Sequence, residues 1–176
     1  GLYHNVETIL VYPSAFIPRR VDEPMFATPG VVHPLLPLLG EAHQRGPVIL
    51  TWDEVRRSGR NPELGYNVVY HEFAHKLDMQ NGEANGFPPL HKGMNSRAWQ
   101  KSFAAAYADF CKRVDAGEDT AIDPYASENP GEFFAVLSEV FFEMPRIIVE
   151  EYPAVYEQLK VFYRQETIAR LYTIPV

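Results

Sequence analysis

The periodicity of apolar residues changes near residue 67, and this change is the strongest constraint on the fold. Before it, short apolar runs at residues 7–12 and 48–52 flank a Pro- and Gly-containing stretch, residues 18–46. Such runs predict short β-strands joined by irregular segments. After it, apolar side chains recur at helical spacing. We therefore expect a mostly helical α+β fold with a small β-sheet formed early in the chain.

Four segments of the second part are predicted to be helices. They comprise residues 67–79, 96–114, 130–143 and 152–170. Asn129 and Pro130 suit the N-cap and first position of the third helix, which residues 144–145 (Met-Pro) end. In the first part, residues 53–57 are expected to form only a helical turn, and residues 58–62 a loop.

Composition limits the class of protein. The length of 176 residues predicts one domain, residues 1–176, and Gly1 in place of Met suggests a trimmed N-terminus. Sixteen basic and 23 acidic residues give a net charge of −7, which argues against nonspecific nucleic-acid binding. No apolar run reaches the ~18 residues of a membrane span, no signal peptide is visible, and a cytoplasmic location is expected. Cys111 is the single cysteine, so a metal site has to use histidine and carboxylate ligands.

The segment His71-Glu72-Phe73-Ala74-His75 carries the strongest chemical signal in the chain. It matches His-Glu-x-x-His, and the i, i+4 spacing places both imidazoles on one helix face, where they can share a Zn²⁺ ion. Glu72 can then take a proton from a water activated at the metal and pass it to a leaving amine. The alternative is a pair of surface histidines on an amphipathic helix. Apolar neighbours favour a half-buried helix, in which two imidazoles need a polar partner.

A third ligand has to come from outside this motif. Asp78 and Asn81 stand where a metzincin has Gly and His, which excludes that class. A glutamate from a second helix is the other solution. We prefer Glu132, in the first turn of the predicted third helix, to Glu128 and to Glu139, which follows it by two turns on the same face. Glu132 can instead serve only to favour the helix N-terminus electrostatically.

Three blocks of sequence together resemble a known family. They are residues 71–78 (HEFAHKLD), 123–126 (DPYA) and 129–139 (NPGEFFAVLSE). These blocks are similar to the Mlc titration factor A family of bacterial zinc peptidases, which are of gluzincin type and related in catalytic fold to anthrax lethal factor. The resemblance covers most of the chain. It implies a zincin-like domain with aminopeptidase-like activity on small peptide substrates.

The resemblance also implies roles for individual residues. By it, His71, His75 and Glu132 are the zinc ligands, and Glu72 is the general base. Tyr125 aligns with a family tyrosine near the metal, and its phenol can donate to the oxyanion of the tetrahedral intermediate.

A fourth zinc ligand and a regulatory partner follow from the same resemblance. His33 aligns with a family histidine that can fill the fourth zinc position and close the site until it moves, and His43 is its rival. The family's name reflects sequestration of the Mlc transcriptional repressor. The alternative function is therefore a regulatory binding protein that sequesters a repressor of sugar uptake, with peptidase activity secondary. Such a partner can open the site by releasing His33.

Further assignments concern residues around the motif. Asp78 lies at i+3 from His75 and can accept its second imidazole N–H, or it can solvate the helix C-terminus. The predicted strand 48–52 can be an edge strand that pairs with an extended substrate beside the zinc, or a core strand without that role. His4 and His91 are expected at the surface.

Overall fold

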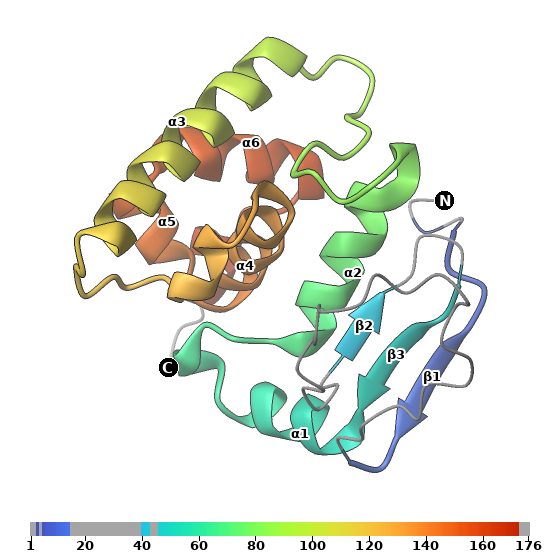
Figure 1. Cartoon of the computed structure of the whole chain (residues 1–176). Coiled ribbons are helices and arrows are strands. Elements are labelled where there is room, and N and C mark those ends of the chain that lie inside the picture. The colour runs from blue at the N-terminus through green and yellow to red at the C-terminus, as the bar shows by residue number, and fades with distance from the viewer. Residues whose placement is uncertain (1–2, 4, 15–39, 43–45, 173–176) are drawn as a thin grey trace, which may run out of the picture.

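The computed structural model describes residues 3, 5–14, 40–42 and 46–172, arranged in two parts on either side of helix α2, Val68–Asp78 (Figure 1). The sheet part contains β1 (Ile9–Tyr12), β2 (Gly40–Ala42), β3 (Val48–Thr51) and α1 (Trp52–Arg60). The helical part contains α3 (Ser96–Asp115), α4 (Pro130–Glu143), α5 (Pro145–Glu151), α6 (Pro153–Tyr163) and α7 (Thr167–Tyr172). Short 3-10 helices are η1 (Pro62–Leu64), η2 (Met79–Asn81) and η3 (Pro124–Ser127).

The described strands form a sheet in the order β1-β3-β2. β1 runs parallel to β3, with Ile9 opposite Val48, and β2 runs antiparallel on the other side of β3. Strand 48–52 is therefore central, and its prediction as an edge strand for substrate is wrong, because both of its sides are already paired. The edge strand that packs beside α2 is β2 (Figure 1).

The predicted mostly helical α+β fold is confirmed, and α2, α3 and α4 lie within one residue of their predicted bounds. Asn67, Asn95 and Asn129 are their N-caps, and each side-chain oxygen accepts a backbone N–H of the first turn. Such caps satisfy donors that a helix start leaves unpaired. The predicted N-cap Asn129 is thus confirmed, and Asn67 and Asn95 cap their helices in the same way.

Two other predicted helix bounds are wrong. A loop was predicted at residues 58–62, but α1 continues to Arg60. Ser58 is buried in this last turn, and its hydroxyl donates to the carbonyl oxygen of Glu54, four residues earlier. The single predicted helix 152–170 is divided into α6 and α7. The break follows Arg164, whose left-handed φ of 55° ends α6.

Two clusters of buried apolar side chains lie on the two sides of α2. The larger is rich in aromatic residues of the helical part, and the Trp99 ring lies 5.9 Å from that of Phe134 and 5.3 Å from that of Phe162. The smaller contains Val48 and Leu50 with Val68 of α2. Each fully buried large apolar side chain contributes about 1.5–3 kcal/mol. Among the described residues, the helical part therefore holds most of the hydrophobic stabilisation.

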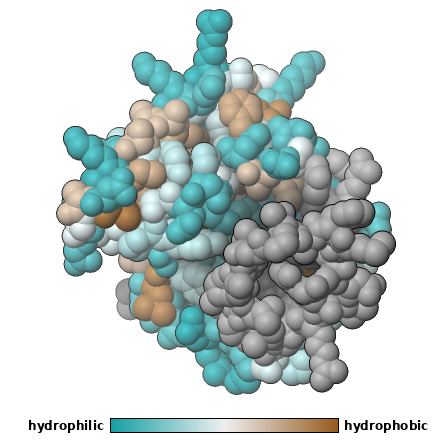
Figure 2. Space-filling view, in the orientation of Figure 1, coloured by the Kyte–Doolittle hydropathy of each residue, from teal (hydrophilic) through white to brown (hydrophobic). Residues whose placement is uncertain are grey.

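The face of the helical part seen in Figure 2 is mostly hydrophilic, and its apolar residues are scattered in small groups. Single exposed apolar residues are normal for a folded domain. Within the described part of the chain, no helix is both long and apolar enough to cross a membrane.

Candidate metal centre

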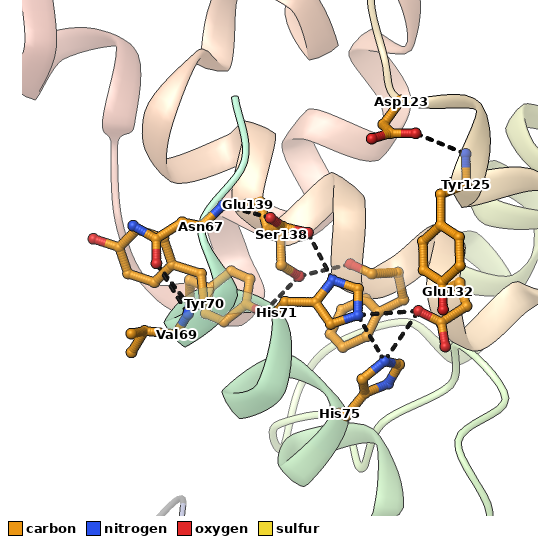
Figure 3. A network of polar contacts seen from close by, with 12 residues as sticks. Asn67, Val69, Tyr70, His71, His75, Asp123, Tyr125, Glu132, Ser138 and Glu139 are labelled. Atoms are coloured by element: carbon orange, nitrogen blue, oxygen red, sulfur yellow. Dashed lines mark hydrogen bonds and ion pairs between the residues drawn. The ribbon is translucent and has the colours of Figure 1, made fainter. Parts of the chain in front are cut away.

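The contact between α2 and α4 brings the predicted metal ligands together. His71 and His75 project from successive turns of α2 toward Glu132 in the first turn of α4 (Figure 3). Asn129 caps α4, and its side chain accepts the backbone N–H of Glu132 at 3.0 Å. Asn67 caps α2 in the same way. The ligands therefore stand on two helices whose starts are fixed by side-chain caps.

The ligating atoms of these three side chains converge on one point. His71 Nε2 lies 3.0 Å from Glu132 Oε2, and His75 Nε2 lies 3.1 Å from His71 Nε2 and 3.2 Å from Glu132 Oε2. Ligands at zinc distances of about 2.0–2.2 Å in a tetrahedron stand about 3.3–3.6 Å apart. Among the described residues, this is the one His/Cys/Asp/Glu group with the spacing to hold a metal ion.

Hydrogen bonding determines which nitrogen His71 turns toward the cluster. Its Nδ1 donates to Glu139 Oε1 at 2.7 Å, so the neutral ring presents an unprotonated Nε2 to Glu132 (Figure 3). A lone pair and a carboxylate at this distance repel each other unless a proton or cation lies between them. A proton can occupy this position. Burial lowers the pKa of His71, but hydrogen bonds to Glu132 and Glu139 outweigh this effect and raise the pKa to about 10. A divalent cation satisfies the same atoms, so the donor set fits a metal.

The carboxyl group of Glu132 is ionised, as a metal ligand has to be. Burial raises its pKa, but hydrogen bonds and charge from His71 and His75 dominate and lower it to about 2. The cluster therefore offers one negative charge and two imidazole nitrogens.

Glu72 and Tyr125 lie beside this cluster. Glu72 is only 6% exposed, and with His71 and Tyr125 it lines one cavity of about 450 Å³. The Tyr125 side chain comes from η3 and lies next to Glu132 (Figure 3). Burial, the charges of Glu132 and Glu128, and a hydrogen bond to Glu132 raise the pKa of Tyr125 to about 12. The phenol therefore keeps its proton at neutral pH and can act as a donor.

Glu139 has a position that sequence reasoning missed. It is 1% exposed, and while one carboxylate oxygen accepts from His71, the other accepts the backbone N–H of Asn67. Glu139 therefore orients a ligand ring and also fixes the start of α2. The sequence contained a signal for this, since a glutamate inside the apolar run 133–142 has to find a buried partner.

Asp78 does not hold His75 as predicted. The two buried atoms that would form that bond, Asp78 Oδ1 and His75 Nδ1, have no hydrogen-bond partner in the described structure. Asp78 Oδ2 instead accepts the backbone N–H of Gly86 at 2.7 Å. Solvation of the helix C-terminus is excluded too, because Asp78 is fully buried. Its carboxylate anchors the loop after α2.

That loop also packs tightly onto the start of α4. A Cβ added at Gly86, whose φ is +76°, would lie 2.5 Å from the carbonyl oxygen of Pro130. A Cβ at Gly131 would lie 2.9 Å from the carbonyl oxygen of Ala84. Real Cβ atoms do not approach so closely, so both positions require glycine. The close approach sets the position of the first turn of α4, which carries Glu132.

Of the remaining histidines, the structure describes only His91. His33, predicted as the fourth ligand, lies outside the described residues, as do its rival His43 and His4. His91 was expected at the surface, and the structure leaves it partly exposed. It is half-buried, with Nε2 2.7 Å from the carbonyl oxygen of Phe162.

This arrangement, a His-Glu-x-x-His helix completed by a glutamate from a second helix, defines the metallopeptidase class of protein. Residues 1–164 match the model of the glucose-regulated metallo-peptidase M90 family. The chain belongs to this family, and the resemblance seen in the sequence is confirmed.

Curated relatives are named Mlc titration factor A. The chain is 38% identical over 167 residues to the protein of Yersinia enterocolitica, which covers 93% of this chain and 60% of the relative. It is 38% identical over 177 residues to that of Pectobacterium atrosepticum, covering 97% and 64%, and 39% over 168 residues to that of Yersinia pestis, covering 93% and 60%. The chain thus spans less than two thirds of the length of these relatives.

Proposed function

We propose that this chain is a zinc-dependent peptidase domain in which His71, His75 and Glu132 hold the ion. The observation that supports this most strongly is the convergence of three ligating atoms within 3.2 Å of one another. Two imidazoles and a carboxylate are a typical catalytic zinc set and leave one position open. When bound, zinc supplies a Lewis acid that polarises a carbonyl group and lowers the pKa of a water to about 7.

Glu72 is the proposed general base. Its carboxylate takes a proton from the attacking water while the bond between water oxygen and carbonyl carbon forms. It then delivers that proton to the amide nitrogen as the C–N bond breaks. The products are a carboxylic acid and an amine, and Glu72 returns to its ionised form. Its position on the wall of the same cavity as His71 supports this assignment.

Tyr125 is the proposed donor to the carbonyl oxygen as negative charge develops on it. The raised pKa of the phenol, about 12, supports this because a donor has to keep its proton at the working pH. The Tyr125 side chain is half-exposed, so a substrate can reach it.

The substitution Glu72→Gln tests the central proposal. The variant should keep one zinc per chain, because Glu72 is not among the converging ligands, and should lose roughly 10²–10⁴-fold in peptide hydrolysis. Zinc content by mass spectrometry and cleavage of a peptide mixture are the two measurements. Glu150→Gln, the same change at an exposed glutamate of α5, is the control. A Glu72→Gln variant that cleaves like wild type contradicts the mechanism.

The resemblance to Mlc titration factor A extends the proposal to aminopeptidase-like cleavage. Peptides with a free N-terminal amine should then be hydrolysed in preference to their N-acetylated forms. Equal rates on both forms contradict this part of the proposal and leave the zinc mechanism standing.

A second candidate function follows from the name that the relatives carry. On this reading the protein binds a Mlc-like transcriptional repressor in the cytoplasm, and peptide hydrolysis is secondary. Titration of purified repressor into wild type and into Glu72→Gln tests it. Equal affinity for both supports a separate binding surface, and no binding to either contradicts this candidate.

A further inference from the structure

The cavity beside the metal cluster extends well beyond the proposed catalytic residues. Its volume is about 450 Å³, within the range of small-ligand pockets. His71, Glu72 and Tyr125 line the side at the cluster. The remainder is enclosed by the segment joining α1 to α2, by the residues before η3, and by α4 and α5. A substrate carbonyl at the cluster therefore has a deep space next to it.

The walls of this space are mainly apolar. Its larger aliphatic lining residues are Leu64, Val68, Val136, Val140 and Ile147, and Tyr66 and Ala121 line it too. Gly65 shapes the floor, because its left-handed backbone (φ +64°) brings it against Met144, where a side chain would lie 3.2 Å from the sulfur. An aliphatic or aromatic group placed here leaves water and gains dispersion contacts on several sides.

Apart from His71, which belongs to the metal cluster, the charged groups that line the cavity are acidic. They are Glu72, Asp123 and Glu139, and no lysine or arginine occurs among the described residues that line it. Glu139 already accepts two hydrogen bonds, and Asp123 accepts the backbone N–H of Tyr125 at 2.9 Å. Away from the cluster, a substrate carboxylate would meet like charge without a lysine or arginine to pair with, so an acidic side chain is disfavoured there.

From these walls and charges we infer that the cavity is a specificity subsite that takes the aliphatic or aromatic side chain of a residue flanking the cleaved bond, and rejects Asp and Glu there. This inference rests on the proposed peptidase function and adds the substrate class. It assigns specificity to residues of α4, α5 and the α1–α2 segment, none of which belongs to the converging ligands.

The first experiment maps the preference directly. Zinc-loaded protein is incubated with a defined equimolar mixture of free peptides, and new termini are identified by mass spectrometry. On one side of the cleaved bond, Leu, Ile, Met and Phe should be favoured over Asp and Glu by at least roughly 10-fold, because burying an unpaired carboxylate costs more than losing one methylene contact in an apolar pocket. A flat profile on both sides overturns the inference.

The second experiment changes the charge at the mouth of the cavity. Ala121 is exposed and lines the cavity, so Ala121→Arg should fold and bring a cation to the acidic rim. Discrimination against a Glu-containing peptide, measured as the kcat/KM ratio of matched Leu and Glu peptides, should fall roughly two- to five-fold. Ala116→Arg, the same change at an exposed alanine that ends α3, should leave the ratio unchanged. Identical ratios for the two variants contradict the assignment.

A third variant reduces the space at the apolar end of the cavity. Val140→Phe should lower kcat/KM for a Phe peptide at least ~10-fold more than for its Ala counterpart, since the cavity loses space for a ring. Zinc content and a thermal melt show whether it folds, and if it does not, the Ala121 and Ala116 pair decides the question.

A binding measurement separates failure of the subsite from failure of the proposed function. Zinc-loaded Glu72→Gln is titrated calorimetrically with the matched Leu and Glu peptides, so that affinity is measured without turnover. Tighter binding of the Leu peptide supports the subsite, and equal binding overturns it. If wild type cleaves no peptide in the mixture, the peptidase proposal and the subsite fall together, whereas cleavage without side-chain preference overturns the subsite alone.

Discussion

The sheet part and the helical part both pack against α2, but among the described residues only those of the helical part join α2 in the candidate metal centre. Glu132 and Glu139 reach α2 from α4, whereas no described residue of the strands or α1 joins the cluster or lines the cavity. The sheet part instead covers the opposite face of α2 with the small cluster around Val48 and Leu50. One face of α2 thus carries the metal ligands, and the opposite face packs against the sheet. Substitutions on these two sides should affect zinc binding differently.

The largest effect is expected from removing a ring of the helical core. Phe134 is fully buried among Trp99, Phe103 and Phe162, so Phe134→Ala should cost about 3–5 kcal/mol of unfolding free energy. Urea denaturation measures it. Zinc affinity should fall as well, because Phe134 lies two residues after Glu132 on α4. Val161→Ala, at an exposed position of α6, should change stability by less than about 0.5 kcal/mol. Equal effects of the two variants would refute this description of the core.

A smaller effect is expected from the matching change in the sheet part. Leu50→Ala should cost about 2–3 kcal/mol, toward the low end for buried leucines, because its cluster is small and can partly collapse. Zinc affinity of the folded variant should remain within about three-fold of wild type, since the ligands stand on α2 and α4. A loss of zinc affinity as large as that of Phe134→Ala would contradict the different roles of the two faces of α2.

The next prediction concerns the face of α2 that carries the zinc ligands. Glutamine at position 139 has one oxygen for the two donors that Glu139 now satisfies, so Glu139→Gln should weaken zinc binding about 10–100-fold. Competition with a chelator of known affinity measures this. Glu143→Gln is the matched control one helical turn later, because Glu143 contacts only the side-chain amide of Asn67 in the described bonds. Equal losses for both variants would show that Glu139 acts through the helix cap alone.

The smallest effect is a pH dependence of zinc binding. The pKa of His71 is raised to about 10, so below that pH the ring carries a proton that zinc has to displace. Binding should release about one proton at pH 8, and zinc affinity should rise with pH until release fades near pH 10. Calorimetry in buffers of different ionisation enthalpy counts the released protons. No release at pH 8 would contradict the described hydrogen bonds of His71.

The sequence was most informative where a local chemical rule decides the structure. Asn129 predicted the start of the helix that carries Glu132, and the i, i+4 spacing of His71 and His75 placed two ligands on one face. Long-range pairing carried no such local signal. The central position of strand 48–52 depends on strands on both sides of it, and the bond from Glu139 to His71 joins residues 68 positions apart.

The glycine contacts at the start of α4 have a consequence for how this gene tolerates variation. In a survey of random single substitutions scored for zinc retention, Gly86 and Gly131 should rank among the intolerant positions, although neither supplies a ligand atom. A methyl group at either one would collide with backbone, so the loop after α2 and the turn that bears Glu132 would have to move apart. Gly59, which has open space around it, should accept alanine without loss. Inherited variation near this centre is thus limited by backbone spacing as strictly as by the identity of the ligands.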